Sequence, residues 1–340
     1  MDLNLLKSSP SSTKRWGRWG FLFLALAAIL VLNSCSQNYL TTASSQASSS
    51  STPPTNVSAN PLTYISEFGS TGTGPGQFIW NQYGLCTDTS GNVYVLDWKD
   101  YRVEKFDNKG NFISQWGNQG TGPSEFTEMD SVCIDSSNNL YILDEGNENV
   151  QKFTSSGGFI TRWGTGGSGQ SQFTKPMGIA CDSSNNIYVV DNANLNIQKF
   201  TNTGTFITSW STVGPWDTAP SNVDGLSADP WGSIYTPDYN NSCVYKYSNT
   251  GAYQCKIGSP GNGPGQLGTV SCGVCVDKKG VVYVTDFSNQ RVSEFTTTGA
   301  YLCEWGNSGP NALGQIDFLC TSPSGQVYVA DYPNVKIFGP

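Results

Sequence analysis

Tyr94-Val95-Leu96-Asp97 is a short pattern that recurs six times along the chain. The other copies are Tyr141-Ile-Leu-Asp144, Tyr188-Val-Val-Asp191, Tyr235-Thr-Pro-Asp238, Tyr283-Val-Thr-Asp286 and Tyr328-Val-Ala-Asp331. Successive copies are spaced by 47, 47, 47, 48 and 45 residues. Such a fixed spacing predicts six copies of one structural unit packed against one another.

Each unit carries the signals of four short strands. In the third unit the runs are Gly178-Ile-Ala-Cys-Asp182, Tyr188–Asp191, Asn196-Ile-Gln-Lys-Phe200 and Thr205-Phe-Ile-Thr-Ser-Trp210, separated by turns rich in Asn and Gly. Four short strands in about 47 residues are typical of one propeller blade. The sequence therefore predicts an all-β fold, a six-bladed β-propeller over residues 61–340.

The last unit stops after its third strand, Val335-Lys-Ile-Phe338, and has no fourth. Leu62-Thr-Tyr-Ile-Ser-Glu-Phe68 aligns with the fourth strands of the other units. We therefore expect this N-terminal strand to pair beside the C-terminal strand and close the ring, which covers an otherwise open sheet edge. Truncating either end of 61–340 should then unfold the whole domain.

Gly74-Pro75-Gly76-Gln77-Phe78, Gly178-Ile179 and Asn196-Ile-Gln-Lys-Phe200 resemble the repeat of the NHL family of six-bladed β-propellers. The resemblance spans residues 61–340 and implies a bacterial, exported, propeller-only type. Animal members of that family with RING or coiled-coil segments bind RNA or proteins, but such segments are not found in this sequence. Amidating-lyase relatives use a histidine-ligated metal, and this chain contains no histidine.

Charge and composition exclude several function classes. Eighteen basic and 26 acidic residues give a net charge of −8 and a pI near 4.5, so we expect no nucleic acid partner. Without histidine the chain has no imidazole metal site and no Ser-His-Asp or Cys-His nucleophile pair.

The N-terminus has the features of an export signal. Lys7, Lys14, Arg15 and Arg18 precede an unbroken apolar run from Phe21 to Leu32, which is too short for a membrane-spanning helix of ~20 residues. Leu32-Asn33-Ser34-Cys35 resembles the lipobox of bacterial lipoproteins. The resemblance implies a lipoprotein signal peptide over 1–34 and lipidation of Cys35, and an ordinary secretory peptide is the alternative.

Residues 35–60 are predicted to form a flexible tether behind the lipidated cysteine, because 36–60 are rich in Ser and Thr and contain no charge. Several acyl chains would anchor the protein stably to a membrane. We therefore expect an extracytoplasmic, lipid-anchored protein, with the outer membrane or cell surface favoured.

Nine cysteines follow Cys35, so they cannot all pair within the chain. One column of the first strands holds Cys86, Cys133, Cys275 and Cys320, with Ala180 and Ser227 in the other units. We expect small buried residues there rather than disulfides. Counting from the turn at Asn249-Thr-Gly251 predicts that Cys243 lies opposite Lys256, out of register with Cys255.

Two repeated features are expected to be structural. The Asp that ends each second strand is needed in every blade, as a residue that caps backbone amides would be. The Gly-rich stretches at 72–76, 164–169 and 261–265 lack the lysine and helix of a phosphate loop, so we expect turns between blades.

The positions just before the first strands differ from unit to unit. In order they are Tyr83, Asp130, Met177, Asp224, Cys272 and Asp317. Asp130, Asp224 and Asp317 occur in alternate blades, which would place three carboxylates around one mouth of the channel. With Glu128 nearby, they would suit Ca²⁺ or another divalent cation, or a cationic ligand.

The loops after the second strands bring aromatic residues to the same mouth: Trp98, Tyr101, Tyr239, Phe287 and Tyr332. An acidic centre with an aromatic rim suits an amine, a sugar face or a basic peptide. The fourth unit departs from the repeat over 211–224, and Trp216 and Asp217 are expected to add to this ligand-binding face. The alternative is that each Asp caps its own loop and each aromatic covers a blade edge.

The sequence thus favours a monomeric, non-enzymatic binding scaffold for a protein, peptide or glycan, with no catalytic residue assigned. One alternative is a metal-dependent hydrolase or lyase that resembles the lactonase propellers, with Asp130, Asp224 and Asp317 holding the cation. Another is a structural component of the cell envelope. Fold analogy does not choose among them.

Overall fold

A computed structural model describes residues 52–54, 57, 60–79, 82–212 and 222–340, except for the side chains of 270–272. The chain divides into two units, Met1–Ser49 and Ser50–Pro340, and the first lies outside the described residues. So do the predicted signal peptide, Cys35, most of the tether, Trp216 and Asp217.

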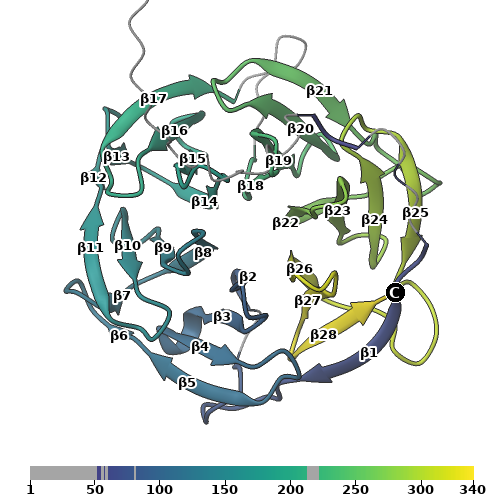
Figure 1. Cartoon of the computed structure of the whole chain (residues 1–340), viewed down its shortest axis with the longest axis horizontal. Coiled ribbons are helices and arrows are strands. Elements are labelled where there is room, and N and C mark those ends of the chain that lie inside the picture. The colour runs from purple at the N-terminus through teal and green to yellow at the C-terminus, as the bar shows by residue number, and fades with distance from the viewer. Residues whose placement is uncertain (1–51, 55–56, 58–59, 80–81, 213–221) are drawn as a thin grey trace, which may run out of the picture. The chain divides into compact units, whose positions relative to one another are not determined.

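Six four-stranded sheets surround a central channel (Figure 1), which confirms the predicted six-bladed β-propeller. The innermost strands are β2 (Leu85–Thr87), β8 (Met129–Ile134), β14 (Pro176–Cys181), β18 (Ser227–Ala228), β22 (Val270–Val276) and β26 (Ile316–Thr321). The second strands are β3 (Val93–Asp97), β9 (Leu140–Asp144), β15 (Ile187–Asp191), β19 (Ser233–Asp238), β23 (Val281–Asp286) and β27 (Val327–Asp331).

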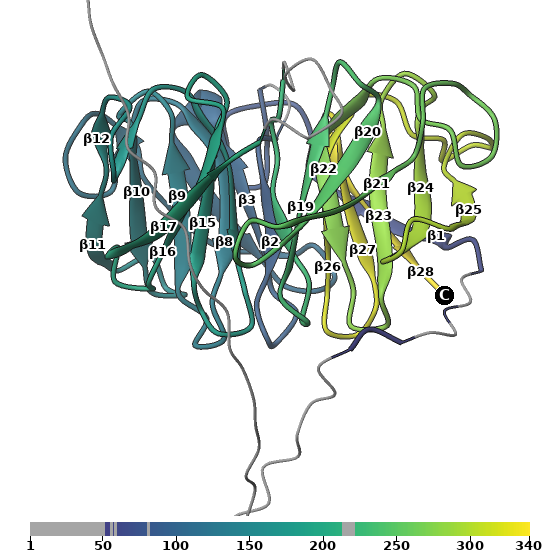
Figure 2. The ribbon, with the colours of Figure 1, turned by 90° about the horizontal axis from the view of Figure 1, so that it is seen from above.

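The outer half of each blade continues the antiparallel order. The third strands are β4 (Arg102–Phe106), β10 (Asn149–Phe153), β16 (Asn196–Phe200), β20 (Cys243–Ser248), β24 (Arg291–Thr296) and β28 (Asn334–Gly339). The outermost strands are β5 (Phe112–Trp116), β11 (Phe159–Trp163), β17 (Phe206–Ser211), β21 (Tyr253–Ile257), β25 (Tyr301–Trp305) and β1 (Thr63–Phe68). The strands of each blade run from one face of the ring to the other, as the side view in Figure 2 shows.

In each of the first five blades, the tyrosine of the repeated pattern donates a hydrogen bond to an aspartate of the same blade. In the second blade Tyr141 is fully buried, and its hydroxyl donates to Asp135 at 2.8 Å. Lys152 on the third strand lies over the Tyr141 ring at 4.9 Å and donates to the Asn202 carbonyl of the next blade. The lysine recurs in the first four blades, where it links each blade to the next. In the fifth blade Glu294 lies opposite the tyrosine instead.

The Asp at the end of each second strand caps the backbone, as predicted. Asp191, for example, accepts from the amides of Thr174 at 2.7 Å, Lys175 at 3.1 Å and Asn194 at 3.0 Å. These bonds pin the loop that enters a blade to the loop that leaves its second strand.

The Gly-rich stretches connect one blade to the next, again as predicted. Two of these connections contain short parallel pairs: β6 (Asn118–Gln119) with β7 (Glu125–Phe126), and β12 (Thr165–Gly166) with β13 (Gln172–Phe173). Gly72 shows why glycine is needed, because its φ is 151° and a Cβ there would lie 2.3 Å from the Gln77 side chain.

The sixth blade takes its outermost strand from the other end of the described chain. β1 pairs antiparallel with β28, from Thr63 opposite Gly339 to Phe68 opposite Val335. Phe68 packs in the core between the sixth and first blades, with its ring 4.6 Å from that of Phe106.

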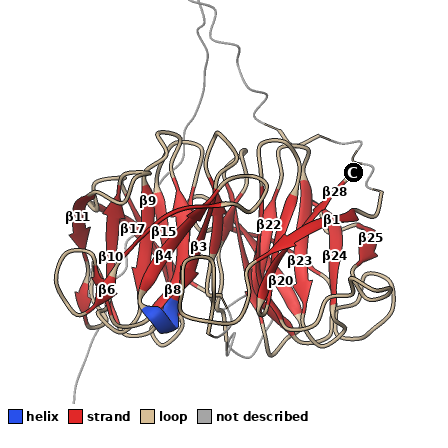
Figure 3. Ribbon diagram, turned by 90° about the horizontal axis from the view of Figure 1, so that it is seen from below, coloured by secondary structure: helices blue, strands red, loops and turns tan. Residues whose placement is uncertain are grey.

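The register predicted for Cys243 is wrong. Lys256 pairs with Tyr245 and Cys255 with Lys246, because a bulge between Lys246 and Tyr247 shifts the register. None of the eight cysteines whose side chains the structure describes is in a disulfide. In the described part of the chain, the only helix is the 3₁₀ turn η1 (Trp98–Asp100), which lies at one mouth of the channel (Figure 3). No helix there is long and apolar enough to span a membrane.

Candidate functional site

Asp130 and Asp317 sit at β-bulges inside their first strands rather than before them, whereas Asp224 precedes its first strand, β18, as predicted. Asp130 is the extra residue between Met129 and Ser131 of β8, and Asp317 lies between the paired Ile316 and Leu319 of β26. Asp224 follows Val223, which bridges to Asp238. A bulge turns an extra side chain out of the regular alternation, and here it does so at one end of the channel.

We call this end the bulge mouth. It is formed by the bulged positions and by the residues that follow each second strand. The members whose side chains the structure describes are Tyr83, Asp130, Met177, Asp224 and Asp317, with Trp98, Glu145, Asn192, Tyr239, Phe287 and Tyr332. Backbone hydrogen bonds join the two layers, as from Glu145 N to Glu128 O at 2.7 Å and from Tyr239 N to Asn222 O at 3.0 Å.

Asp130 forms a carboxyl pair with Glu145. Asp130 is only 4% exposed, its carboxyl is hydrogen bonded to that of Glu145, and its Oδ2 atom has no hydrogen-bond partner. Burial raises the pKa of Asp130 well above its usual range, and the nearby Glu145 and Glu128 raise it further. Burial also raises the pKa of Glu145. The pair therefore shares one proton near neutral pH.

Asp224 belongs to the same acidic group. Its Oδ1 accepts from Asn192 Nδ2 at 3.2 Å, and burial raises its pKa. Asp224 raises the pKa of Glu145, whereas Lys175 lowers the pKa values of both residues. One exposed lysine thus faces a group of four carboxyls, Glu128, Asp130, Glu145 and Asp224.

The predicted three-carboxylate metal site is not assembled. Among the residues that the structure describes, no three Cys, Asp or Glu side chains are grouped so that they could hold one metal ion. Asp130 turns to Glu145 and Asp224 to Asn192, while Asp317 lies beside Thr285, which donates to its backbone carbonyl at 3.1 Å.

Aromatic residues form the rest of the bulge mouth. Tyr239 is 45% and Phe287 39% exposed. The Trp98 ring meets that of Tyr83 edge-on at 5.3 Å, and the Tyr332 hydroxyl donates to the Ile79 carbonyl at 2.9 Å. Tyr101 lies further out, where its hydroxyl accepts from Gln119 at 3.1 Å. The mouth therefore carries acidic residues on blades two, four and six, and aromatic residues on blades one, four, five and six.

Sequence reasoning missed Glu145, Asn192 and Lys175. Glu145 and Asn192 occupy the column that holds Trp98, Tyr239, Phe287 and Tyr332 in the other blades. Reading that column in full, rather than for aromatic residues alone, would have found both. Nothing in the sequence indicates that Lys175 contacts this group electrostatically.

The sequence matches two family profiles. Residues 78–153 match a family described as a six-bladed β-propeller, and residues 273–295 match the NHL repeat. No curated protein sequence matches the chain significantly.

Several solved structures share the fold. A streptogramin B lyase superposes with a TM-score of 0.59 at 15% identity, covering 82% of this chain and 98% of the lyase. A Bacteroides thetaiotaomicron protein of unknown function gives 0.59 at 19% identity, covering 83% and 72%. A gluconolactonase from Xanthomonas campestris gives 0.55 at 12% identity, covering 76% and 86%. At these identities the likeness concerns the fold alone.

Proposed function

We propose that this six-bladed β-propeller with NHL-repeat sequence is a non-enzymatic binding module that takes a basic peptide segment of a partner protein at the bulge mouth. The observation that carries the proposal is the group of four carboxyls, Glu128, Asp130, Glu145 and Asp224, which interact with one another at this mouth. An ammonium or guanidinium group donates hydrogen bonds and pairs with carboxylates.

The aromatic residues of the mouth favour the same class of ligand. Exposed Tyr239 and Phe287 provide ring faces, which attract cations and pack against the apolar stems of Lys and Arg. The acidic group and these rings lie on adjacent parts of one mouth, so a segment with a basic residue beside an apolar one could contact both.

The hydrolase or lyase alternative has less support. One solved relative of this fold is a catalytically inactive histidine-to-alanine variant of virginiamycin B lyase from Staphylococcus aureus, and the present chain has no histidine. A lactonase-like mechanism would need a cation held by grouped carboxylates, and Asp130, Asp224 and Asp317 do not form such a group in the described chain.

The test is calorimetric titration of the full chain with acetyl-Lys-Trp-Lys-amide, and with acetyl-Glu-Trp-Glu-amide for comparison. We expect only the basic peptide to bind, and salt to weaken binding. Glu145→Gln should weaken it about tenfold, which corresponds to about 1.4 kcal/mol. Glu67→Gln removes a charge from the exposed outer strand β1 and should change nothing.

Two outcomes count against the proposal. One is no binding of the basic peptide even at low salt. The other is an equal weakening by Glu145→Gln and Glu67→Gln, which would indicate nonspecific attraction to an acidic protein. Binding of a neutral oligosaccharide in place of the peptide would favour the glycan alternative.

The proposal places the protein outside the cytoplasm, anchored by lipid on Cys35. Its support is the N-terminal sequence alone, with basic residues, an apolar run and Leu32-Asn33-Ser34-Cys35 in that order. Mass spectrometry of the protein from membranes should find acyl chains on Cys35, and Cys35→Ser should release the protein from the membrane fraction. An unmodified Cys35 would refute the anchor and leave the binding proposal standing.

A further inference from the structure

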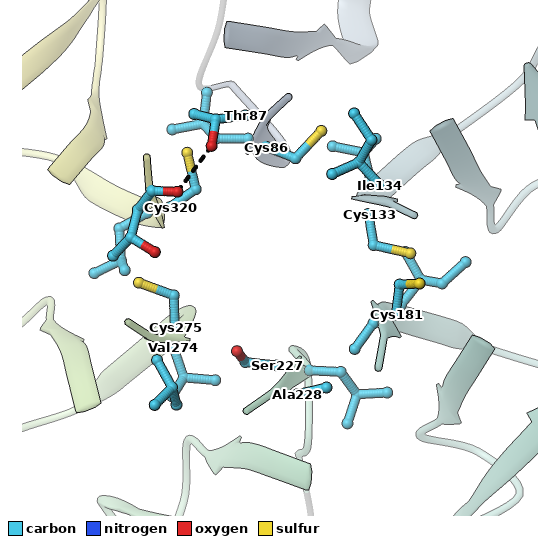
Figure 4. Close-up of a pocket in the computed structure, with 18 residues that line it drawn as sticks. Cys86, Thr87, Cys133, Ile134, Cys181, Ser227, Ala228, Val274, Cys275 and Cys320 are labelled. Carbon is cyan, nitrogen blue, oxygen red and sulfur yellow. Dashed lines mark hydrogen bonds between the residues drawn. The ribbon is translucent and has the colours of Figure 1, made fainter. Parts of the chain in front are cut away.

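Five cysteines line the middle of the central channel. A cavity of about 220 Å³ is bounded by the innermost strands of all six blades. Figure 4 labels the five cysteines among its lining residues, which are Cys86, Cys133, Cys181, Cys275 and Cys320. In a chain without histidine, these thiols are the soft donor groups of the channel.

Only some of these thiols face another thiol. Cys181 of β14 follows Ala180, the residue that occupies the same column as Cys133 of β8. Because successive residues of a strand point to opposite sides, Cys133 and Cys181 point toward each other in the seam between the second and third blades. Cys133 is buried in the core cluster of that seam, and Cys181 packs against the cluster. Figure 4 shows the two sulfur atoms turned toward the same part of the wall. One seam earlier, Cys86 shares its cluster with Ile134.

The pair can be reached from the end of the channel opposite the bulge mouth. We call this end the turn mouth. Its cavity of about 390 Å³ is bounded by the turns between first and second strands, and Cys181 lines both this cavity and the thiol-lined one. Four aspartates border it: Asp88, Asp135, Asp182 and Asp229.

We propose that Cys133 and Cys181 together bind one soft, two-coordinate cation of the Cu(I) class, which enters through the turn mouth. Two thiols lose one proton each and two sulfur–metal bonds form, so no electron is transferred. Thiolates select such cations over hard ones. Two ligands suffice for linear coordination, whereas no group of three donors that could hold a metal ion is found among the described residues.

The surroundings fit a thiolate pair. Burial raises the pKa values of both thiols, so they are protonated in the free protein and binding must release two protons. The ammonium group of Lys152 lowers the pKa of Cys181. Lys152 thereby offsets part of the negative charge that two thiolates and a monovalent cation would place in the channel.

The experiment uses the full chain with Cys35→Ser and Cys272→Ser, reduced and handled under nitrogen. Cu(I) is added in competition with a chromogenic Cu(I) chelator, which single thiols cannot overcome. We expect one equivalent of Cu(I) to resist the chelator, with release of two protons. Cys133→Ser and Cys181→Ser should each abolish this equivalent. Cys86→Ser, equally buried in the same column but facing Ile134, should retain it.

Three results would overturn the proposal. They are the loss of all Cu(I) to the chelator, retention of the equivalent in Cys133→Ser, and recovery of a Cys133–Cys181 disulfide from the protein before reduction. Circular dichroism of each variant checks that it remains folded. Peptide binding at the bulge mouth provides a second readout of each variant.

Discussion

Two kinds of aspartate at the bulge mouth differ in their hydrogen bonding. Asp191, at the end of a second strand, accepts four hydrogen bonds from Thr174, Lys175 and Asn194. Asp130, on a bulge, keeps one oxygen without a partner and shares a proton with Glu145. The first kind supports the blade, and the second belongs to the group of carboxyls that we propose as the ligand-binding part of the mouth.

Asp130→Asn should make stability less dependent on pH. The raised pKa of Asp130 means that the folded protein holds this proton to a higher pH than the unfolded chain does. The resulting stabilisation is complete below the ordinary aspartate pKa of about 4 and is lost as pH rises through the folded-state pKa. We expect the variant to exceed the wild type by about 1–3 kcal/mol at pH 8, and the difference to shrink toward pH 4.

Urea unfolding at pH 4, 6 and 8 measures this difference. Glu67→Gln serves as the control, because Glu67 is exposed on the outer strand β1. A difference between Asp130→Asn and the wild type that stays constant over this range would contradict the shared proton.

Much of this chemistry could be read from the sequence. The capping aspartates follow from their repetition, and the acidic bulge positions from their variation between blades. The bulges themselves could not be predicted, because a bulge adds a residue without changing the apolar pattern around it. The failure of Asp130, Asp224 and Asp317 to gather follows from local partners such as Glu145 and Asn192, which only the folded chain brings close.

At the scale of strands, the third strand holds the Gly-rich connection in place. In the first blade Arg102 of β4 donates to the carbonyls of Thr73 at 2.8 Å and Gln77 at 2.9 Å. It also pairs with Asp97 and Glu104, both at 3.0 Å. Arg291 makes corresponding contacts in the fifth blade. The Arg102 side chain thus stabilises both the buried carboxyls of Asp97 and Glu104 and the Gly-rich connection that contains Thr73 and Gln77.

Arg102→Met should destabilise the protein most at high pH. Burial raises the pKa of Asp97 to about 6 and that of Glu104 to about 7, even though Arg102 opposes both shifts. Without the guanidinium both pKa values rise further, so stability falls as pH rises through them. We expect a loss of about 3–5 kcal/mol at pH 8 and a smaller loss at pH 5, where the carboxyls are protonated.

Urea unfolding at the two pH values tests this prediction. Arg162→Met is the matched control, because Arg162 is exposed and donates to the backbone carbonyl of Thr121. An Arg102→Met variant with the same loss at pH 5 and pH 8 would show that the loop contacts, not the buried carboxyls, dominate.

At the scale of the whole molecule, one ring carries two chemically different openings. The bulge mouth combines carboxyls with aromatic rings, while the turn mouth leads to thiols. Between them lies a cavity of about 40 Å³ bounded by residues such as Ser131, Ile179 and Phe318. Repetition predicts the ring, but not the contrast between its ends, which depends on residues that differ from blade to blade.

Removal of β1 should unfold the propeller as a whole. A chain that begins at residue 69 lacks the outer strand of the sixth blade and the Phe68 ring that packs between two blades. It also exposes the edge of β28, which invites aggregation. We expect loss of the folded monomer in size-exclusion chromatography and of the β signal in circular dichroism.

A chain that begins at residue 52 is the control and should elute as a folded monomer. If the chain that begins at residue 69 also stays folded and monomeric, β1 is dispensable and the sixth blade is stable with three strands.

The pairing of β1 with β28 also determines how the propeller responds to mechanical tension. Thr63 lies opposite Gly339 at one end of the pair, and Phe68 lies opposite Val335 at the other. A pull that separates Thr63 from Gly339 loads the hydrogen bonds one at a time from that end, rather than together. The sheet should therefore open as a zipper does, at a low force, and the ring would yield first at the junction where its two ends meet.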